Sequence, residues 1–383
     1  MQLARLPFRS TVSAYHSQAD QLFHAWKAGD ADAIEFLRTQ HPQFRHDQIH
    51  WLARQVPIDE LRSAGFDNTD AQLAIARWYD FRDWPALGEW VDAVANEGSP
   101  VEEFESAVEA VIHGDTAVLK RLLRDHPEVV YSRSTRIAPF DPPVHRAALL
   151  HYIGANGVEG YRQMTPSNAV EVAKMLLDAG SDPNALADMY GGQHATLPLL
   201  VSSSHPAQAG LQVPLIDTLV DYGASVAPIG AGLWASPLLT ALAFGYRDAA
   251  EALVRRGAPI QTLSAAAGLG RFEEASQLLR EAEPEDRHRA LALAVQNGSI
   301  EVVRLLLDAG EDPNRYNPSQ NHSHSTPLHQ AVWSGHMEIV CLLVARGARL
   351  DIIDTLWHGT PLDWAEYGGR REIAEFLRSH QTT

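Results

Sequence analysis

Apolar residues along this chain recur at helical spacing in short runs, and glycines separate the runs. The clearest example begins at Thr326, whose hydroxyl can cap a helix start, and continues with Pro327 at the first helical position, where a missing N–H has no cost. Apolar residues between 328 and 332 give this first helix a hydrophobic side, and Gly335 supplies the left-handed residue that ends it. A second helix follows and closes at Gly347. Two helices this short cannot bury a core by themselves, so the pattern predicts stacked neighbours.

The same pair of helices is repeated on both sides of this stretch. The next copy starts at Thr360, 34 residues after Thr326, which is close to a known repeat period of about 33 residues. The earlier copies share a small residue before a turn glycine and a second helix rich in Leu or Val. They lie at 291–310, 263–279, 236–257, 196–223 and 150–180, with weaker copies at 107–123 and 22–37. Copies in one frame along most of the chain predict an all-α solenoid.

The stretch Thr326-Pro327-Leu328-His329-Gln330-Ala331 resembles the signature of the ankyrin repeat. The Asp-Pro-Asn turns at 182–184 and 312–314 resemble that family's Asp-Val-Asn turn. The irregular helical leader and two inserted repeats resemble bacterial ankyrin-repeat proteins. This resemblance implies an ankyrin-repeat solenoid of stacked helix-turn-helix units with a helical N-terminal cap. It also implies that finger-like loops and the exposed faces of the first helices form a concave surface that binds another protein.

The first hundred residues fit the repeat frame less well, and we interpret them as a cap over the end of the array. Residues 1–98 are predicted to form this helical N-terminal cap from degenerate repeat-like helix pairs, and residues 101–383 are predicted to form the ankyrin-repeat array. Helices are expected at 71–79, capped by one of residues 68–70, and at 84–94. Aromatic residues crowd into this part of the chain, and we expect them to pack as core. They are Trp78, Tyr79, Phe81, Trp84 and Trp90.

Composition narrows the class of partner. The chain is 45% hydrophobic and 21% charged, which is ordinary for a globular protein, and its formal charge of −17 argues against nucleic acid and anionic membranes. Cys341 is the only cysteine, so we expect neither a disulfide framework nor a zinc knuckle. We expect a cytoplasmic monomer without a cofactor, since no signal peptide or membrane span is apparent.

Two insertions depart from the repeat. Residues 158–168 delay the second helix of the fourth unit, and residues 205–210 extend the same loop of the fifth. Neighbouring loops of a solenoid share an edge, so the insertions are predicted to meet beside the concave groove, which often is the binding face. The side chains singled out on them are Glu159, Tyr161, Arg162 and His205. Alternatively, the loops cover an exposed edge and their polar groups are solvated.

The finger loops and first helices supply a second set of candidates, biased toward aromatic residues and histidine. This bias favours an aromatic-anchored peptide or a planar or sugar-like ligand in the concave groove. The alternative is that tryptophans of adjacent fingers pack against each other. The candidates are Asn156, Tyr190, His194, Trp234, Phe244, Trp333 and Trp357.

Metal binding and catalysis have weaker support. His322 and His324 alternate along an extended segment and could share a metal ion, but no ligand motif with fixed spacing supports such a site. No nucleophile elbow, P-loop or dinucleotide motif occurs. An acid–base enzyme acting on a small molecule (a lyase, isomerase or hydrolase) stays the alternative to a protein-binding module. Its catalytic groups would be Glu159, Tyr161, Arg162, His194 and His205.

Overall fold

The computed structural model describes residues 1–383 except 2, 47–51, 55, 230–232 and 382–383, and its chain forms two compact units. The N-terminal unit spans Met1–Leu211 and the C-terminal unit spans Gln212–Thr383. The helices of the N-terminal unit are α1 (Val12–Lys27), α2 (Ala31–Gln40), α3 (Ile58–Ser63), α4 (Asn68–Trp78), α5 (Trp84–Ala95), α6 (Pro100–His113), α7 (Thr116–Asp125), α8 (Leu149–Ile153), α9 (Ala169–Asp178), α10 (Thr196–Leu200) and α11 (Ser204–Gln208). It also holds the 3-10 turns η1 (Pro42–Phe44), η2 (Pro127–Tyr131) and η3 (Gly160–Arg162), and the strands β1 (Ala187–Met189) and β2 (Gly192–His194).

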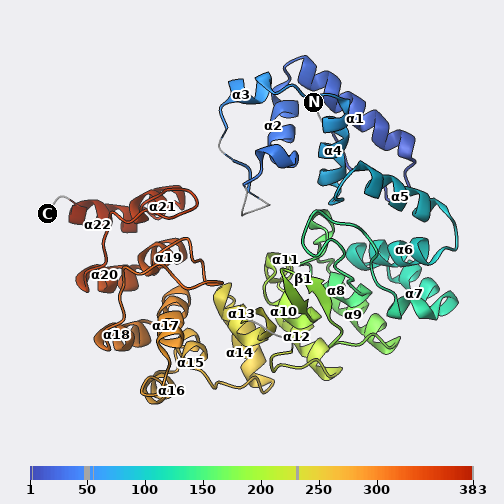
Figure 1. The fold of residues 1–383 in the computed structure, drawn as a ribbon. Coiled ribbons are helices and arrows are strands. Elements are labelled where there is room, and N and C mark those ends of the chain that lie inside the picture. The colour runs from blue at the N-terminus through green and yellow to red at the C-terminus, as the bar shows by residue number, and fades with distance from the viewer. Residues whose placement is uncertain (2, 47–51, 55, 230–232, 382–383) are drawn as a thin grey trace. The chain divides into compact units, whose positions relative to one another are not determined.

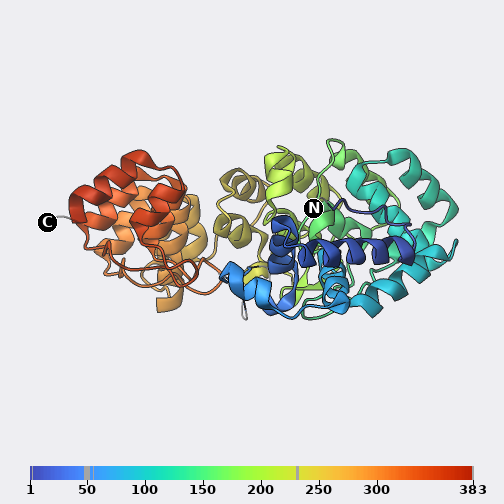
Figure 2. The same cartoon turned by 90° about the horizontal axis from the view of Figure 1, so that it is seen from above.

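The C-terminal unit is a regular stack of helix pairs (Figures 1 and 2). First helices pack on first helices from α13 to α21, and second helices pack on second helices from α16 to α22 and between α12 and α14. Its elements are α12 (Gln212–Asp221), η4 (Leu233–Ala235), α13 (Pro237–Ala243), α14 (Arg247–Arg255), α15 (Leu263–Leu269), α16 (Phe272–Leu278), α17 (Pro284–Gln296), α18 (Ile300–Asp308), α19 (Pro327–Ser334), α20 (Met337–Ala345), α21 (Pro361–Tyr367) and α22 (Arg371–Gln381). The predicted all-α repeat solenoid is confirmed.

The turn glycines end the first helices as expected. Gly335 closes α19 in the left-handed conformation with a φ of 76°, and its N–H bonds back to the carbonyl of Val332. Gly114 and Gly270 close α6 and α15 in the same way. A non-glycine residue is disfavoured at such a φ, which explains why these three helices end at a glycine.

The predicted helices near the N-terminus are present as α4 and α5, but the predicted cap of α4 was wrong by one residue. Asp67 precedes the expected 68–70 and accepts hydrogen bonds from the N–H groups of Thr69 and Asp70. Buried residues of α1, α2, α4 and α5 form one apolar cluster, which includes Tyr79, Phe81 and Trp90. These aromatic residues are core, as predicted. The division of the chain at residues 98–101 stays a prediction.

Both insertions of the N-terminal unit carry short ordered elements. Residues 158–168 contain η3, and residues 204–208 form α11. In the finger ahead of α10, β1 and β2 pair antiparallel, with Ala187 opposite His194. None of the helices in the described part of the chain is long and apolar enough to cross a membrane.

Candidate functional site

Four aromatic side chains at the C-terminal end of the stack form a surface that we call the C-terminal aromatic surface: Trp333, Trp357, Trp364 and Tyr367. Trp333 lies in the last turn of α19, and its ring stacks on that of Tyr367 with a centroid separation of 6.5 Å and an angle of 17°. Trp364 of α21 lies 6.0 Å from Trp333 and 5.9 Å from Trp357, at angles of 77° and 68°. Trp333 is 48% exposed and Trp357 is 51% exposed. The rings therefore present apolar faces in more than one direction.

A buried carboxylate holds the loop that carries Trp357. Asp354 is fully buried and accepts hydrogen bonds from the N–H groups of Leu356, Trp357 and Gly359 and from the indole Nε1 of Trp364, at 2.7 to 2.9 Å. Burial alone would raise the pKa of Asp354, but these four donors outweigh it and lower that pKa. The carboxylate is therefore ionised at neutral pH, directly beside the edge of Trp364.

Two histidines at the repeat's own histidine position are structural, as the family resemblance implies. His329 Nε2 donates to the carbonyl of Gly359 at 3.2 Å, and His329 Nδ1 accepts from the N–H of Thr326 at 3.3 Å. The Thr326 hydroxyl lies 2.8 Å from this Nδ1, and Thr326 is the N-cap of α19 in a capping box with His329, at the helix start where a cap was predicted. His151 Nε2 contacts the carbonyl of His194 at 3.3 Å, and burial lowers the pKa of His151 to about 4.

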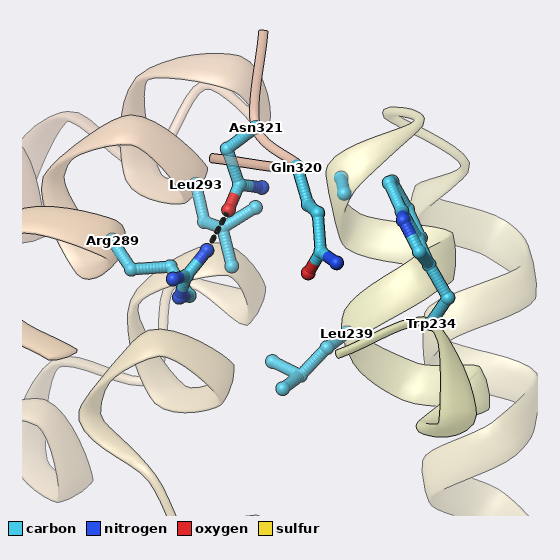
Figure 3. Close-up of a pocket in the computed structure, with 7 residues that line it drawn as sticks. Trp234, Leu239, Arg289, Leu293, Gln320 and Asn321 are labelled. Carbon is cyan, nitrogen blue, oxygen red and sulfur yellow. Dashed lines mark hydrogen bonds between the residues drawn. The ribbon is translucent and has the colours of Figure 1, made fainter. Parts of the chain in front are cut away.

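A second feature of the C-terminal unit is a small pocket beside Trp234, between α13 and α17. Figure 3 shows Gln320 and Leu239 pointing into the space between Trp234 and Arg289. Arg289 Nη1 donates to the Asn321 side-chain oxygen at 2.5 Å. Trp234 is half-buried and packs on Phe244 at 5.3 Å. The pocket volume is about 10 Å³, which is room for about one water molecule and far below that of a metabolite site.

In the N-terminal unit the finger candidates converge on one hydrogen-bonded group. Tyr190 lies at the tip of the β1–β2 hairpin with a φ of 52°, followed by Gly191 with a φ of 71°, which is the geometry of a two-residue hairpin turn. The Tyr190 hydroxyl donates to the Asn156 side-chain oxygen at 2.5 Å, and the Asn156 amide donates to Ser202 Oγ at 2.6 Å. Tyr190 is 62% exposed.

The predicted placement of Glu159 and Arg162 at an exposed groove was wrong. Both are fully buried and pair with residues of the N-terminal unit far away in sequence. Arg162 contacts Glu105 at 2.7 Å and Glu109 at 3.0 Å. Glu159 contacts Arg136 at 3.0 Å and His145 at 3.1 Å. The inserted loop is tied into the core because a buried charge must be paired.

These contacts also decide what Glu159 can do chemically. Burial alone would raise its pKa, but Arg136 and His145 outweigh that effect and lower the pKa of Glu159 well below its ordinary value. A fully buried carboxylate of this kind is neither accessible to a substrate nor poised for proton transfer near neutral pH. Tyr161, next to it, is half-buried, and its ring lies 4.4 Å from the guanidinium of Arg5.

The two remaining catalytic candidates lie in different environments. His194 is only 4% exposed on β2 and packs on Tyr190, so its predicted exposure was also wrong. His205 is the second residue of the inserted helix α11 and is exposed, as expected.

The two histidines weighed as metal ligands have protein partners. His322 Nε2 lies 3.3 Å from the carbonyl of Ala243, to which it donates, and His324 packs on Trp357 at 5.1 Å. Among the described residues, the groups close enough together to share an ion are instead Glu103, His126 and Glu128. There His126 is already paired with Glu103 at 2.8 Å.

Sequence reasoning missed two members of the C-terminal aromatic surface, Trp364 and Tyr367. A signal for Tyr367 exists in the turn. Gly369, with a φ of 66°, is the left-handed residue that corresponds to Gly335, so Tyr367 occupies the position of Trp333. If Gly368 is taken as the turn glycine instead, Tyr367 is shifted by one position and no longer matches Trp333.

Comparisons with known proteins agree with this architecture. The family model for ankyrin repeats (3 copies) matches residues 238–317 and 262–354. Human cyclin-dependent kinase 4 inhibitor B is 34% identical over 137 residues, which cover 35% of this chain and 96% of that protein. Human cyclin-dependent kinase inhibitor 2A is 35% identical over 121 residues, covering 30% and 75%. Mouse ankyrin repeat and SAM domain-containing protein 6 is 35% identical over 95 residues, covering 25% and 10%. The chain belongs to the ankyrin-repeat family.

Proposed function

We propose that this chain is a protein-interaction module and that the C-terminal aromatic surface is a main part of its binding face. The observation that carries the proposal is the exposure of aromatic rings on first helices and fingers, where a self-contained stack has no need of them. Tyr367 is 87% exposed and still stacks on Trp333. Large, rigid aromatic residues dominate the energetics of protein interfaces because they bury much area at little cost in side-chain entropy.

The candidates of the central repeats that are exposed or half-buried extend this proposal. Tyr190 and His205 belong to the N-terminal unit, whereas Trp234 and Phe244 belong to the C-terminal unit. Phe244 is 39% exposed at the end of α13, in the same part of its repeat as Trp333. Glu159 and Arg162 are buried, so His205 is the residue of the inserted loops that we propose contacts a partner.

The names of the relatives suggest one partner to test. Two of them are inhibitors of cyclin-dependent kinases, and the similarity covers about a third of this chain. That similarity supports a protein partner bound by repeats. A cyclin-dependent kinase is therefore one arm of the experiment. The cytoplasmic location, the bacterial type and the monomeric state stay predictions.

A small-molecule enzyme has less support. The proposed proton-transfer group Glu159 is buried in ion pairs, and the pocket beside Trp234 has a volume of about 10 Å³. A drug-sized ligand needs a pocket of roughly 300 Å³ or more.

The test is a comparison of surface variants with one purified partner. A partner is captured from a lysate, purified, and titrated against the full chain by calorimetry, in parallel with a purified cyclin-dependent kinase. Trp333→Ala with Trp357→Ala should weaken partner binding by about 100-fold or more, since interface tryptophans are typical hot spots. The matched control is Phe272→Ala, because Phe272 is 43% exposed but begins the second helix α16. Equal binding by the double variant and the parent would disprove the proposed face. Loss only with Tyr190→Ala and His205→Ala would move the face to the N-terminal unit.

A further inference from the structure

The C-terminal aromatic surface has an unusual electrostatic setting. The ionised carboxylate of Asp354 accepts a hydrogen bond from the Trp364 indole at 2.9 Å, behind the exposed rings. Asp363, the third residue of α21, accepts a hydrogen bond from the N–H of Thr360, the N-cap of that helix. The carboxylate of Asp363 lies close enough to favour a positive charge on His329, and that of Asp354 does the same for His324 and His329. A hydrogen bond from an indole N–H to a carboxylate makes the ring more electron-rich. The negative ring faces and the carboxylates therefore both attract positive charge.

Among the residues that the structure describes, no arginine or lysine lies over the rings of Trp333, Trp357, Trp364 or Tyr367. Arg370 is at this surface, but its guanidinium donates to the backbone carbonyl of Trp333 at 2.8 Å.

The N-terminal unit shows what this chain does with similar rings in its interior. There the Arg136 guanidinium lies 4.0 Å from the ring of Phe81 and 4.7 Å from that of Trp90. Arg5 lies 4.4 Å from the rings of both Trp78 and Tyr161. The C-terminal surface has the rings and the carboxylates of such a site without the cation.

We propose that the C-terminal aromatic surface binds the guanidinium or ammonium group of an arginine or lysine in a basic segment of the partner protein. The side chain lies over the faces of Trp333 and Trp357, with the carboxylates of Asp354 and Asp363 providing the complementary charge. This inference rests on the proposed function and adds the chemistry of the partner. It fits a chain whose own charge of −17 attracts basic partners over a longer range.

Short peptides test the charge preference separately from any natural partner. The full chain is labelled with 5-fluorotryptophan, and each fluorine resonance is assigned with single tryptophan variants. The probes are acetylated Gly-Ser-X-Ser-Gly amides in which X is arginine, lysine, norleucine or glutamate. Arginine and lysine peptides should shift the Trp333 and Trp357 resonances saturably. The affinity of the norleucine peptide should be at least about fivefold lower than that of the arginine peptide. A fivefold loss corresponds to roughly 1 kcal/mol of cation–π attraction.

Variants locate the effect. Trp333→Ala and Trp357→Ala should each reduce affinity for the arginine peptide by about fivefold. Phe272→Ala is the matched control in the same unit, because Phe272 is 43% exposed but begins the second helix α16, and this variant should bind the arginine peptide as tightly as the parent does. Far-UV circular dichroism and melting of each variant establish that the fold is retained.

Several outcomes overturn the inference. Norleucine binding as tightly as arginine would show that the surface takes a neutral anchor, and tighter binding of the glutamate peptide would reverse the predicted charge. No shift with any peptide at the highest soluble concentration would also contradict it. If the purified partner still requires Trp333 and Trp357 in such a case, the proposed function stands and only the cationic ligand is wrong. If no partner depends on these residues, the proposed function fails whatever the peptides show.

Discussion

Each of the two units carries a cluster of aromatic residues, and the clusters differ in what covers them. In the N-terminal unit, Phe81 and Trp90 are buried, with the guanidinium of Arg136 over their faces. In the C-terminal unit, Trp333, Trp357 and Tyr367 are each about half exposed or more. The same residue types thus serve packing in one unit and are available to a partner in the other.

The two units also differ in where their extra loop residues lie, in the interior of the fold or at its surface. The insertion of the fourth repeat delivers Arg162 and Glu159 into the interior, where they pair with Glu105 of α6 and with Arg136. Near α19 and α21, the loop around Asp354 is held by its own backbone, and its tip presents Trp357 outward. An extra loop can therefore seal a stack or extend its surface, depending on whether its charges find partners within the chain.

The largest effect is expected from breaking the buried ion network of the N-terminal unit. Arg162→Ala would leave Glu105 buried without its closest partner at 2.7 Å. We expect a loss of about 3–5 kcal/mol in the free energy of unfolding, measured by denaturant titration of the full chain followed by circular dichroism. The control is Arg124→Ala, because Arg124 is 71% exposed and pairs with its neighbour in sequence, Asp125. It should change stability by about 0.5 kcal/mol or less. Equal stability of the two variants would contradict the assigned role of the network.

A second effect of the buried N-terminal polar groups is a dependence of stability on pH. Burial lowers the pKa of His151 from 6.5 in the unfolded chain to about 4 in the folded chain. Between these values the unfolded chain takes up a proton that the folded chain does not, so stability is complete above about pH 6.5 and is lost as pH falls toward 4. The loss should reach up to about 3 kcal/mol. Denaturant titrations at pH 7, 6 and 5 measure it, and a flat profile would show that His151 is not held neutral.

Sequence reasoning predicted the helix pairs because each pair is specified locally. A capping residue, a proline at the first helical position and a left-handed glycine all lie within one repeat, as at Thr326, Pro327 and Gly335. Two residues of the proposed binding surface, Trp333 and Trp357, could be singled out from the sequence, since they stand where the repeat places first-helix and finger side chains.

The burial of the 158–168 insertion, and the residues with which it pairs, could not be predicted in this way. Arg162 lies 53 residues beyond Glu109 along the chain, and nothing local identifies Glu109 or Glu105 as its partner. A polar loop between helices has the same composition whether it is solvated or paired inside the fold. The sequence places Arg162, His194, His205 and Trp234 alike among the groove candidates, but Arg162 and His194 are buried, so replacing all four by alanine should strongly destabilise the fold.

A smaller effect is expected for the stability of the C-terminal surface. Trp333→Ala should cost about 1 kcal/mol or less, because the side chain is about half exposed and leaves no sealed cavity. The matched change in the other cluster, Trp90→Ala, removes a side chain that is 6% exposed and should cost about 3–5 kcal/mol. Denaturant titrations of both variants measure the contrast. A similar loss in both would show that Trp333 is also structural, and would weaken the case for a binding surface.

The smallest effect concerns the pH dependence of the cationic site itself, where we expect almost none in the physiological range. His324 packs on Trp357 at 5.1 Å, and a proton on its ring would repel an incoming cation. Burial, together with the nearby charge of His322, lowers the pKa of His324 to about 4, so the ring stays neutral well below the ordinary 6.5. Affinity for the arginine peptide should therefore be constant between about pH 7.5 and 5.5, one unit on either side of that ordinary value. It should fall only as pH approaches 4. A decrease centred near 6.5 in the peptide titrations would mean that His324 is solvated, and His324→Gln should then restore a constant affinity. A decrease that persists in His324→Gln would place the titrating group elsewhere on the surface.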